Sequence, residues 1–488
     1  MKVDMAALAV FVFFFLLITV MGFAAARWQR PKTLAQIDEW GLGGRRFGTW
    51  ITWFLVGGDF YTAYTVIAVP ALVYAVGAYG FFALPYTIIV YPFVFAVMPK
   101  LWQVAKDNGY VTAADVVHGR YGSRALELAV AATGVIATMP YIALQLIGIA
   151  TVLKALGLSG EVPLIAAFAV LAVFTYSSGL RAPALIAFVK DTMIYIVVIA
   201  AVLLVPSKLG GYGAIFAAAD QAFQAKGAGG ILLSASQETA YATLALGSAL
   251  AAFMYPHTLT GILASQSKNT IRKNAALLPA YTLLLGLIAL LGYMGHAAHL
   301  QITSPNDVVP ALFKTLFPGW FAGFAFAAIG IGALVPAAVM SIGAANLFTR
   351  NVWKAYIDPG ADPAREAQVA KITSLVVKLG ALLAIVFLPT QFALDLQLLG
   401  GVWILQTLPA VVFGLFFGWF RAPALLAGWL AGFAGGTALA WVNGLKPLQA
   451  LPLGHASVTV YIGLLALAVN ILVAAIVNLV PLKRVSHA

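Results

Sequence analysis

The chain has 488 residues, of which 62% are hydrophobic and 9% are charged, with a formal net charge of +12. A soluble domain carries about 25% charged residues, so this chain has too few polar side chains to cover a soluble surface. The composition therefore excludes a soluble globular protein, a disordered chain and a nucleic-acid-binding protein. It contains no cysteine, which excludes disulfides and thiolate metal sites. These features indicate a multi-pass protein of the lipid bilayer.

Apolar segments long enough to cross a bilayer follow one another along the whole chain. The first, from Asp4 to Arg27, lacks the basic start and small-residue cleavage site of a signal peptide, so we expect an uncleaved span. A short amphipathic helix over 307–316 is expected at the outer surface. With about 20 apolar residues per crossing, the sequence predicts thirteen helices, over 4–26, 48–79, 80–103, 124–156, 162–179, 183–207, 237–266, 274–299, 319–350, 367–389, 391–418, 421–442 and 456–481.

The charges of the loops give an independent test of this count. With thirteen crossings, 21 of the Lys and Arg residues fall in loops on one side and six on the other, and Lys378 lies within a span. Cytoplasmic loops collect Lys and Arg. The asymmetry therefore predicts an N-terminus outside the cell and a C-terminus in the cytoplasm.

Two of the predicted spans are interrupted near their middle. The second span has Gly57 and Gly58 followed by Asp59, and the seventh has Pro256 between Tyr255 and His257. Unwound backbone within a membrane is tolerated where it lines a cavity or is buried in protein. Two broken helices five spans apart are typical of an inverted-repeat transporter with its site at the breaks. Ordinary kinks are the alternative, and the ionisable residues beside both breaks favour the site.

Ionisable residues within spans are costly and so are candidates for function. Asp59 is the strongest candidate, whereas the pair Lys190 and Asp191 could also be interfacial and reach water. Lys378 is either hydrogen-bonded to a neighbouring helix or part of a proton relay, and Asp395 lies near the outer edge. Uncharged polar residues serve either helix packing or the solute; these are Tyr141, Gln145, Ser341, Gln397 and Gln406. The catalytic motifs of nucleotide hydrolases, serine hydrolases and zinc proteases are absent, so we expect a transporter, driven by an ion gradient, and not an enzyme.

The chain resembles the sodium/solute symporter family from Asp38 to about residue 440. The resemblance rests on Asp38 to Phe47 before the first core helix, on the loop Thr112 to Ser123, and on the two breaks. It also rests on Ala338 to Ser341, similar to the family's sodium-site helix. Within the family the chain is most similar to bacterial monocarboxylate permeases, on 58–62 and 344–351.

The resemblance implies an all-α, LeuT-type core of five-plus-five inverted repeats in a bacterial plasma membrane. The implied divisions are 1–47 (an extra helix and cytoplasmic loop), 48–207 (first repeat), 208–236 (external loop), 237–418 (second repeat) and 419–488 (two additional helices).

The family's sodium site would use carbonyls of Gly57, Phe60 and Ala338 and the hydroxyl of Ser341. This sequence departs from the family there, because Ile342 offers no second hydroxyl and Lys190 stands where the family more often has Thr. An ammonium can take the place of sodium, and burial favours the neutral form of a lysine. The coupling ion is therefore Na⁺ or H⁺, without any other cofactor.

The sequence thus predicts a cation-coupled symporter that imports a small carboxylate such as acetate, lactate, pyruvate or propionate by alternating access. Carriers of zwitterions such as proline or pantothenate remain an alternative, and a channel or a membrane sensor is the alternative from another class. The ion site is expected at Gly57, Asp59, Phe60, Lys190, Asp191, Ala338 and Ser341. The solute site is expected at Thr62, Thr65, Gln145, Tyr255, His257, Thr258, Trp403 and Gln406, of which Trp403 and Gln406 would help to close the outer path.

Overall fold

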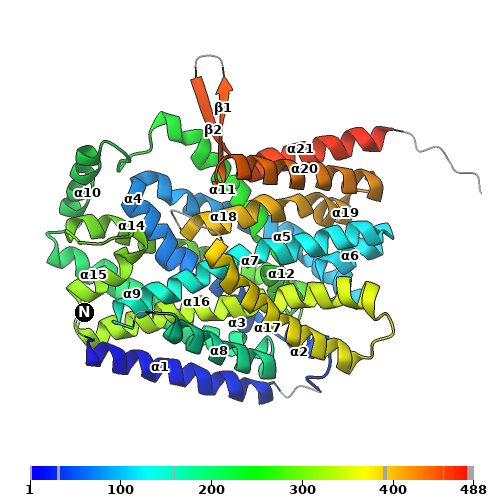
Figure 1. Cartoon of the computed structure of the whole chain (residues 1–488), viewed down its shortest axis with the longest axis horizontal. Helices are drawn as coiled ribbons and strands as arrows, with labels where there is room; N and C mark the ends of the chain where they lie inside the picture. The colour runs from blue at the N-terminus through cyan, green and yellow to red at the C-terminus, as the bar shows by residue number, and fades with distance from the viewer. Residues whose placement is uncertain (1–2, 30–32, 159, 388–392, 454–455, 481–488) are drawn as a thin grey trace, which may run out of the picture.

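The computed structural model describes the whole chain except residues 1–2, 30–32, 159, 388–392, 454–455 and 481–488. Its helices run side by side in one bundle (Figure 1). Within the described residues, nine helices are long and apolar enough to cross a membrane. A helix lies in each of the thirteen predicted spans, and some of these helices are short or interrupted.

The helices in the predicted spans have the following bounds, in chain order. They are α1 (Met5–Ala24), α3 (Thr49–Thr52) with η3 (Trp53–Gly57), η4 (Tyr64–Ala68) and α4 (Val69–Val76), α5 (Ala83–Asp107), α7 (Arg124–Ala155), α8 (Glu161–Ser178), α9 (Arg181–Lys208), α11 (Glu238–Ala252) with α12 (Pro256–Leu263), α14 (Pro279–Ala297), α16 (Gly319–Phe348), α17 (Pro363–Phe387), α18 (Ala393–Ile404) with η9 (Leu405–Thr407), η10 (Pro409–Phe413) and α19 (Gly414–Phe416), α20 (Ala422–Val442) and α21 (Ile462–Leu479).

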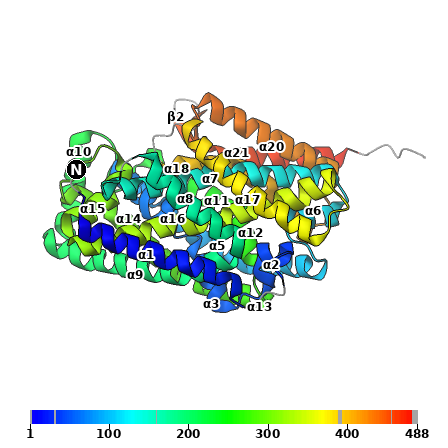
Figure 2. The same ribbon diagram turned by 60° about the horizontal axis from the view of Figure 1, so that its bottom comes forward.

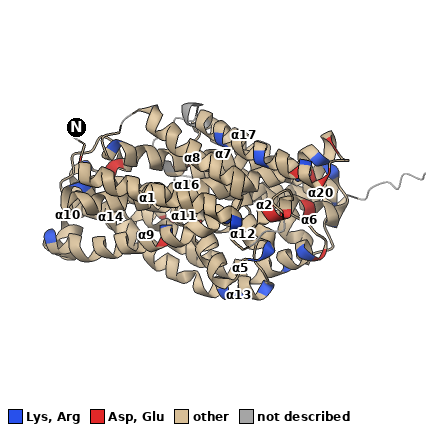
Figure 3. Ribbon diagram, turned by 90° about the horizontal axis from the view of Figure 1, so that it is seen from below, with Lys and Arg blue, Asp and Glu red and all other residues tan. Residues whose placement is uncertain are grey.

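Shorter elements cap the ends of the bundle. One end carries α2 (Ile37–Leu42), α6 (Ala113–Tyr121) and α13 (Lys268–Leu277), and the other carries α10 (Tyr212–Lys226) and α15 (Val308–Leu316) (Figure 2). The amphipathic helix predicted over 307–316 is confirmed by α15. Figure 3 shows that the charged residues lie mainly at the two ends of the bundle, with many Lys and Arg around α6 and α13.

The structure corrects the sequence-based expectations at the start of the last helix. The last predicted helix was expected to begin at residue 456, but β1 (Leu448–Leu453) and β2 (Ala456–Tyr461) form an antiparallel hairpin, and α21 begins at Ile462. The segment Ser457 to Tyr461 is rich in β-branched residues and ends on an aromatic one, which favours a strand. The segment predicted as an external loop over 208–236 contains α10, and its place outside the cell stays a prediction. The boundaries of the two repeats stay a prediction.

Helix α16 forms the centre of the bundle and is buried on all faces. It packs against α7, α1, α9, α17 and α12, while α1 runs along the outside of the bundle (Figure 2). Glycines allow these backbones to approach closely. A Cβ added at Gly323 would lie 2.2 Å from the carbonyl oxygen of Ala7, and one at Gly343 would lie 2.8 Å from the carbonyl carbon of Pro256. Gly343 therefore brings α16 directly against the start of α12.

Candidate functional site

The first core helix is unwound between η3 and η4, at residues 59–62, which we call the first break. Its backbone groups find partners on nearby side chains. The hydroxyl of Thr65 accepts from the Thr62 amide at 3.0 Å, and the hydroxyl of Thr62 accepts from the Tyr64 amide at 2.9 Å. Gln145 of α7 accepts from the Ala63 amide at 3.0 Å. Thr62, Thr65 and Gln145 therefore hold the first break open in a buried position.

The second break covers residues 253–255, between α11 and α12. Pro256 occupies the first turn of α12, where a missing amide proton costs nothing. The hydroxyl of Thr258 donates to the carbonyls of Ala252 at 2.7 Å and Tyr255 at 2.9 Å. Thr258 thus supplies a partner for the backbone carbonyls at the second break, as Thr62 and Thr65 supply partners for backbone amides at the first break.

The two breaks meet in the interior of the protein. The rings of Phe60 and Phe253 lie 6.0 Å apart, one from each break. Tyr141 of α7 lies against the second break, 5.3 Å from the ring of Tyr255 and 5.4 Å from that of His257. Gln145, one turn further along α7, reaches the first break. The predicted meeting of the two breaks is therefore present in the structure.

Several buried polar atoms near the breaks have no hydrogen-bond partner within the described part of the chain. Asp59 and His257 are only 3% and 1% exposed to solvent. Polar atoms buried without a partner are costly, so such atoms at a break point to a ligand. They are Asp59 Oδ2, the hydroxyl of Tyr64, His257 Nδ1 and Gln397 Oε1.

The Lys190 ammonium lies at the first break and is completely buried. It donates to the carbonyls of Gly58 at 2.6 Å and Tyr61 at 3.1 Å, and it lies 2.9 Å from Asp191 Oδ1. The hydroxyl of Tyr281 in α14 donates to Asp191 Oδ2 at 2.8 Å. The interfacial alternative for Lys190 is therefore wrong.

The sodium ligands expected from the family pattern are arranged differently. The Gly57 carbonyl accepts from the Phe60 amide at 2.9 Å. The Ser341 hydroxyl donates to Ala338 at 2.8 Å and lies 3.0 Å from the Ser374 hydroxyl of α17. The Lys378 ammonium then binds the same Ser374 hydroxyl at 2.9 Å. The Gly57 carbonyl and the Ser341 hydroxyl thus take part in internal hydrogen bonds, and Ser341 is directed to α17, so this set does not fit a sodium ion in the way that the family pattern implies.

Two predicted solute-site residues lie apart from the breaks. Trp403 donates to the Thr437 hydroxyl of α20 at 3.0 Å, and Gln406 contacts Asn470 of α21 at 3.1 Å. Their predicted role in closing the outer path stays a prediction, and both side chains face the C-terminal helices. Tyr255, by contrast, joins the second break to α18, because its hydroxyl donates to the Gln397 carbonyl at 3.0 Å.

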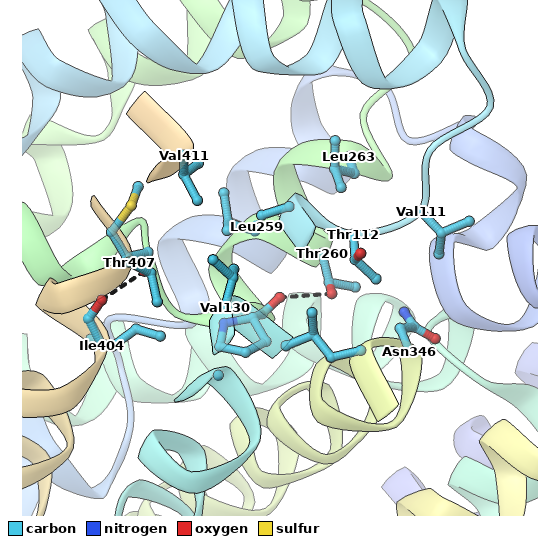
Figure 4. Close-up of a pocket in the computed structure, with 16 residues that line it drawn as sticks. Val111, Thr112, Val130, Leu259, Thr260, Leu263, Asn346, Ile404, Thr407 and Val411 are labelled. Atoms are coloured by element: carbon cyan, nitrogen blue, oxygen red, sulfur yellow. Dashed lines mark hydrogen bonds between the residues drawn. The ribbon is translucent and has the colours of Figure 1, made fainter. Parts of the chain in front are cut away.

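A narrow cavity begins at Pro256 and extends along α12 toward the segment before α6 (Figure 4). The space inside it is about 20 Å³, which is enough for about one water molecule. The hydroxyls of Thr260 and Thr407 in its wall are bound to the carbonyls of Pro256 and Ile404. The wall is otherwise mainly apolar, and Asn346 adds one amide. The cavity thus connects the second break with the end of the bundle that carries α6.

Tyr64, Tyr281 and Ser374 were missed by the reasoning from sequence. Tyr64 lies one turn beyond the first break, which could have marked it as a candidate. Tyr281 and Ser374 lie in helices whose neighbours the sequence alone does not reveal. Their importance follows from contacts with Asp191 and Ser341.

Comparisons with known proteins agree over nearly the whole chain. Residues 40–432 match the profile of the sodium:solute symporter family. A monocarboxylate transport permease protein of Rhizobium johnstonii is 78% identical over 478 residues, which cover 98% of this chain and 97% of that protein. The uncharacterized symporter YodF of Bacillus subtilis is 33% identical over 89% of this chain and 88% of its own.

A solved structure shares the fold. A Na⁺-coupled sialic acid symporter in a substrate-bound, outward-open state has a TM-score of 0.78 and 16% identity, over 97% of this chain and 98% of that chain. This likeness concerns the fold alone. It confirms the all-α, LeuT-type architecture that the sequence predicts.

Proposed function

Since this chain belongs to the sodium:solute symporter family, we propose that it imports short monocarboxylates, such as acetate, lactate, pyruvate or propionate, together with a cation. The observation that carries the proposal is the meeting of two broken helices around buried polar atoms without partners. The name of the Rhizobium johnstonii relative supports the substrate class. The solute would cross unchanged, so we propose transport and not catalysis.

The second break provides a suitable place for the carboxylate. The N-terminus of α12 begins there, and the helix dipole makes it attractive to an anion. His257 Nδ1 and the Tyr64 hydroxyl are buried polar groups without a hydrogen-bond partner among the described residues, and both can donate to a carboxylate. The rings of Phe60 and Phe253 would contact the short apolar part of the solute. This small aromatic surface suits two to four carbons better than a large sugar.

The formal charges at the first break explain why a cation would accompany the anion. The Lys190 ammonium lies 2.9 Å from the Asp191 carboxylate and neutralises it, whereas Asp59 Oδ2 has no hydrogen-bond partner in the described part of the chain. The group therefore carries one net negative charge when all three residues are ionised. A carboxylate entering this buried region would meet unfavourable electrostatics unless a cation arrived with it. The coupling cation is Na⁺ or H⁺, and imposed gradients of each ion separately decide between them.

We propose the orientation that the loop charges predict, in the plasma membrane of a bacterium. The N-terminus and α10 would then lie outside the cell, and α2, α6 and α13 would face the cytoplasm. The concentration of Lys and Arg around α6 and α13 in Figure 3 supports this orientation. The cavity along α12 would lie on the path from the breaks to the cytoplasm.

Uptake of labelled pyruvate by proteoliposomes tests the substrate class. We expect saturable uptake that unlabelled acetate, lactate and propionate reduce, while proline and pantothenate do not. Inhibition by proline or pantothenate without inhibition by the carboxylates would instead support a carrier of zwitterions. Flux that increases linearly with the solute concentration and does not change with the ion gradients would contradict a symporter and support a channel. Liposomes without protein provide the background.

A further inference from the structure

The contacts of Lys190 describe a cation that is already bound. Its ammonium has three protons, and three oxygen atoms lie within 3.1 Å of it, from Gly58, Tyr61 and Asp191. The residue is completely buried. Carbonyl and carboxylate oxygens are also the ligands that a hard cation prefers. The ammonium therefore uses the groups that an unwound helix offers to a metal ion.

A second network holds this arrangement in place from α14. Tyr281 donates its hydroxyl to Asp191 at 2.8 Å, and its own carbonyl accepts from the Tyr61 hydroxyl at 2.6 Å. The rings of Tyr61 and Tyr281 lie 4.6 Å apart. The first break, α9 and α14 are thus joined through one buried cluster, and the Lys190 ammonium is its positive charge.

The hydroxyl of Ser341, another ligand that the family pattern implies, is directed away to α17. The Ser341 hydroxyl is directed to Ala338 and to Ser374, and Ser374 in turn binds the ammonium of Lys378. Ile342, the next residue, contributes no oxygen. A sodium ion at the carbonyls of Gly58 and Tyr61 would have to displace the Lys190 ammonium. The displaced ammonium would be a buried charged group without partners, which is costly.

We propose that the Lys190 ammonium is a built-in cation that takes the place of sodium at the first break, so that this position does not bind Na⁺. The inference deepens the proposed function and rests on it for the role of the break in transport. It concerns this position alone. Unlike a free sodium ion, this cation is the side chain of a residue in α9, so it cannot leave with the solute.

Thermal unfolding of the purified, detergent-solubilised protein tests the assignment without any transport. The melting temperature is measured in increasing NaCl, with KCl and choline chloride at equal ionic strength as references. We expect the three salts to give the same curve. A saturable rise specific to Na⁺ would overturn the proposal, because an ion that binds the folded state stabilises it.

Variants then test whether the lysine itself excludes sodium. Lys190→Ala removes the ammonium and frees the carbonyls of Gly58 and Tyr61 and the carboxylate of Asp191, and Ile342→Ser added to it supplies a further hydroxyl. We expect Na⁺ to raise the melting temperature of one or both variants by at least about 2 °C. Lys378→Met is the matched control, because it also removes a buried lysine but keeps the Lys190 ammonium. It should show no specific response to Na⁺.

The outcomes separate this inference from the proposed function. The assignment would be overturned if Lys190→Ala and the double variant both fold and neither melting temperature responds to Na⁺. A melting temperature of Lys378→Met that responds specifically to Na⁺ would also overturn it. If the Lys190 variants do not fold, the unmodified protein still decides through its own response to Na⁺. Absence of monocarboxylate uptake would reject the proposed function and would leave the unfolding result unaffected.

Discussion

At the scale of single residues, the first break depends on the absence of a side chain at Gly58. The backbone there is helical, with φ −63°, so glycine is not required for its conformation. It is required by its neighbours. A Cβ would lie 2.8 Å from Asp191 Oδ2 and 2.9 Å from Lys190 Nζ. Gly58 therefore lets the ion pair of α9 lie directly against the unwound backbone.

Gly58→Ala should abolish uptake of labelled pyruvate. The added methyl group would push the ammonium away from its carbonyls, at a cost of about 1–3 kcal/mol in the free energy of unfolding. Uptake and thermal unfolding are measured on the same purified protein. Gly435→Ala is the control, because a Cβ there meets nothing within 4 Å in helix α20. Unchanged uptake in Gly58→Ala would show that the contact between break and ion pair is not needed.

The positions of the breaks could be predicted from single residues, whereas the atoms that line them could not. Gly57, Gly58 and Pro256 mark both breaks because glycine and proline disturb a helix in any context. The carbonyls that bind the ammonium belong to Gly58 and Tyr61, one residue beyond the expected Gly57 and Phe60. Carbonyl directions at a break depend on dihedral angles that residue types do not determine.

At the scale of elements, tyrosines connect helices that the breaks leave short. Tyr255 at the second break donates to the Gln397 carbonyl, and Tyr461 at the start of α21 donates to the next carbonyl, of Leu398, at 2.6 Å. The pair Gly400 and Gly401 makes room for these hydroxyls, because a Cβ would approach them to 2.7 Å and 2.3 Å. Helix α18 is thus held by the second break on one side and by α21 on the other.

Tyr255→Phe should slow uptake and lower the free energy of unfolding by about 1 kcal/mol, the usual contribution of one hydrogen bond. The change keeps the ring and removes the link between the second break and α18. Initial uptake rates and thermal unfolding report the two effects. Tyr356→Phe serves as a control, because the exposed hydroxyl of Tyr356 also binds a carbonyl, of Arg124, at 2.9 Å. Equal effects of both substitutions would contradict a special role for Tyr255.

The elements that sequence reasoning missed or displaced share a physical reason. The hairpin at 448–461 lies between two apolar helices, and a window of about 20 apolar residues does not separate its second strand from α21. Trp403 contacts α20 and Gln406 contacts α21, and their predicted role at the outer path stays a prediction. Which face of a helix points toward the site depends on where the additional helices pack. An apolar helix in a bilayer shows little hydrophobic periodicity, so its sequence does not indicate that face.

At the scale of the whole molecule, the bundle is organised around α16, which contacts α1 of the N-terminal region and helices of both predicted repeats. The breaks and the cavity along α12 lie beside this central helix. Transport by alternating access would require the α12 cavity to widen from about one water to the size of the solute. The orientation of the bundle in the membrane determines whether the widened cavity opens to the cytoplasm or to the outside of the cell.

The absence of native cysteine allows the orientation to be measured with single introduced thiols. Ala228→Cys follows α10 and Ala364→Cys lies in the first turn of α17, and both positions are exposed. A maleimide that does not cross membranes should label the first in intact cells and the second after permeabilisation. The reverse pattern would contradict the proposed orientation.

Gradient-driven uptake of labelled pyruvate tests the central claim most directly, in proteoliposomes of the unmodified protein and of Asp59→Ala. We expect an inward gradient of a single cation to drive uptake above equilibrium, and we expect Asp59→Ala to abolish this uptake while the variant remains folded. Asp107→Ala, an exposed acid outside the breaks, should transport normally. With Lys190 as the built-in cation, we expect the H⁺ gradient to drive uptake without Na⁺. Normal uptake by Asp59→Ala, or uptake that no cation gradient changes, would contradict the account.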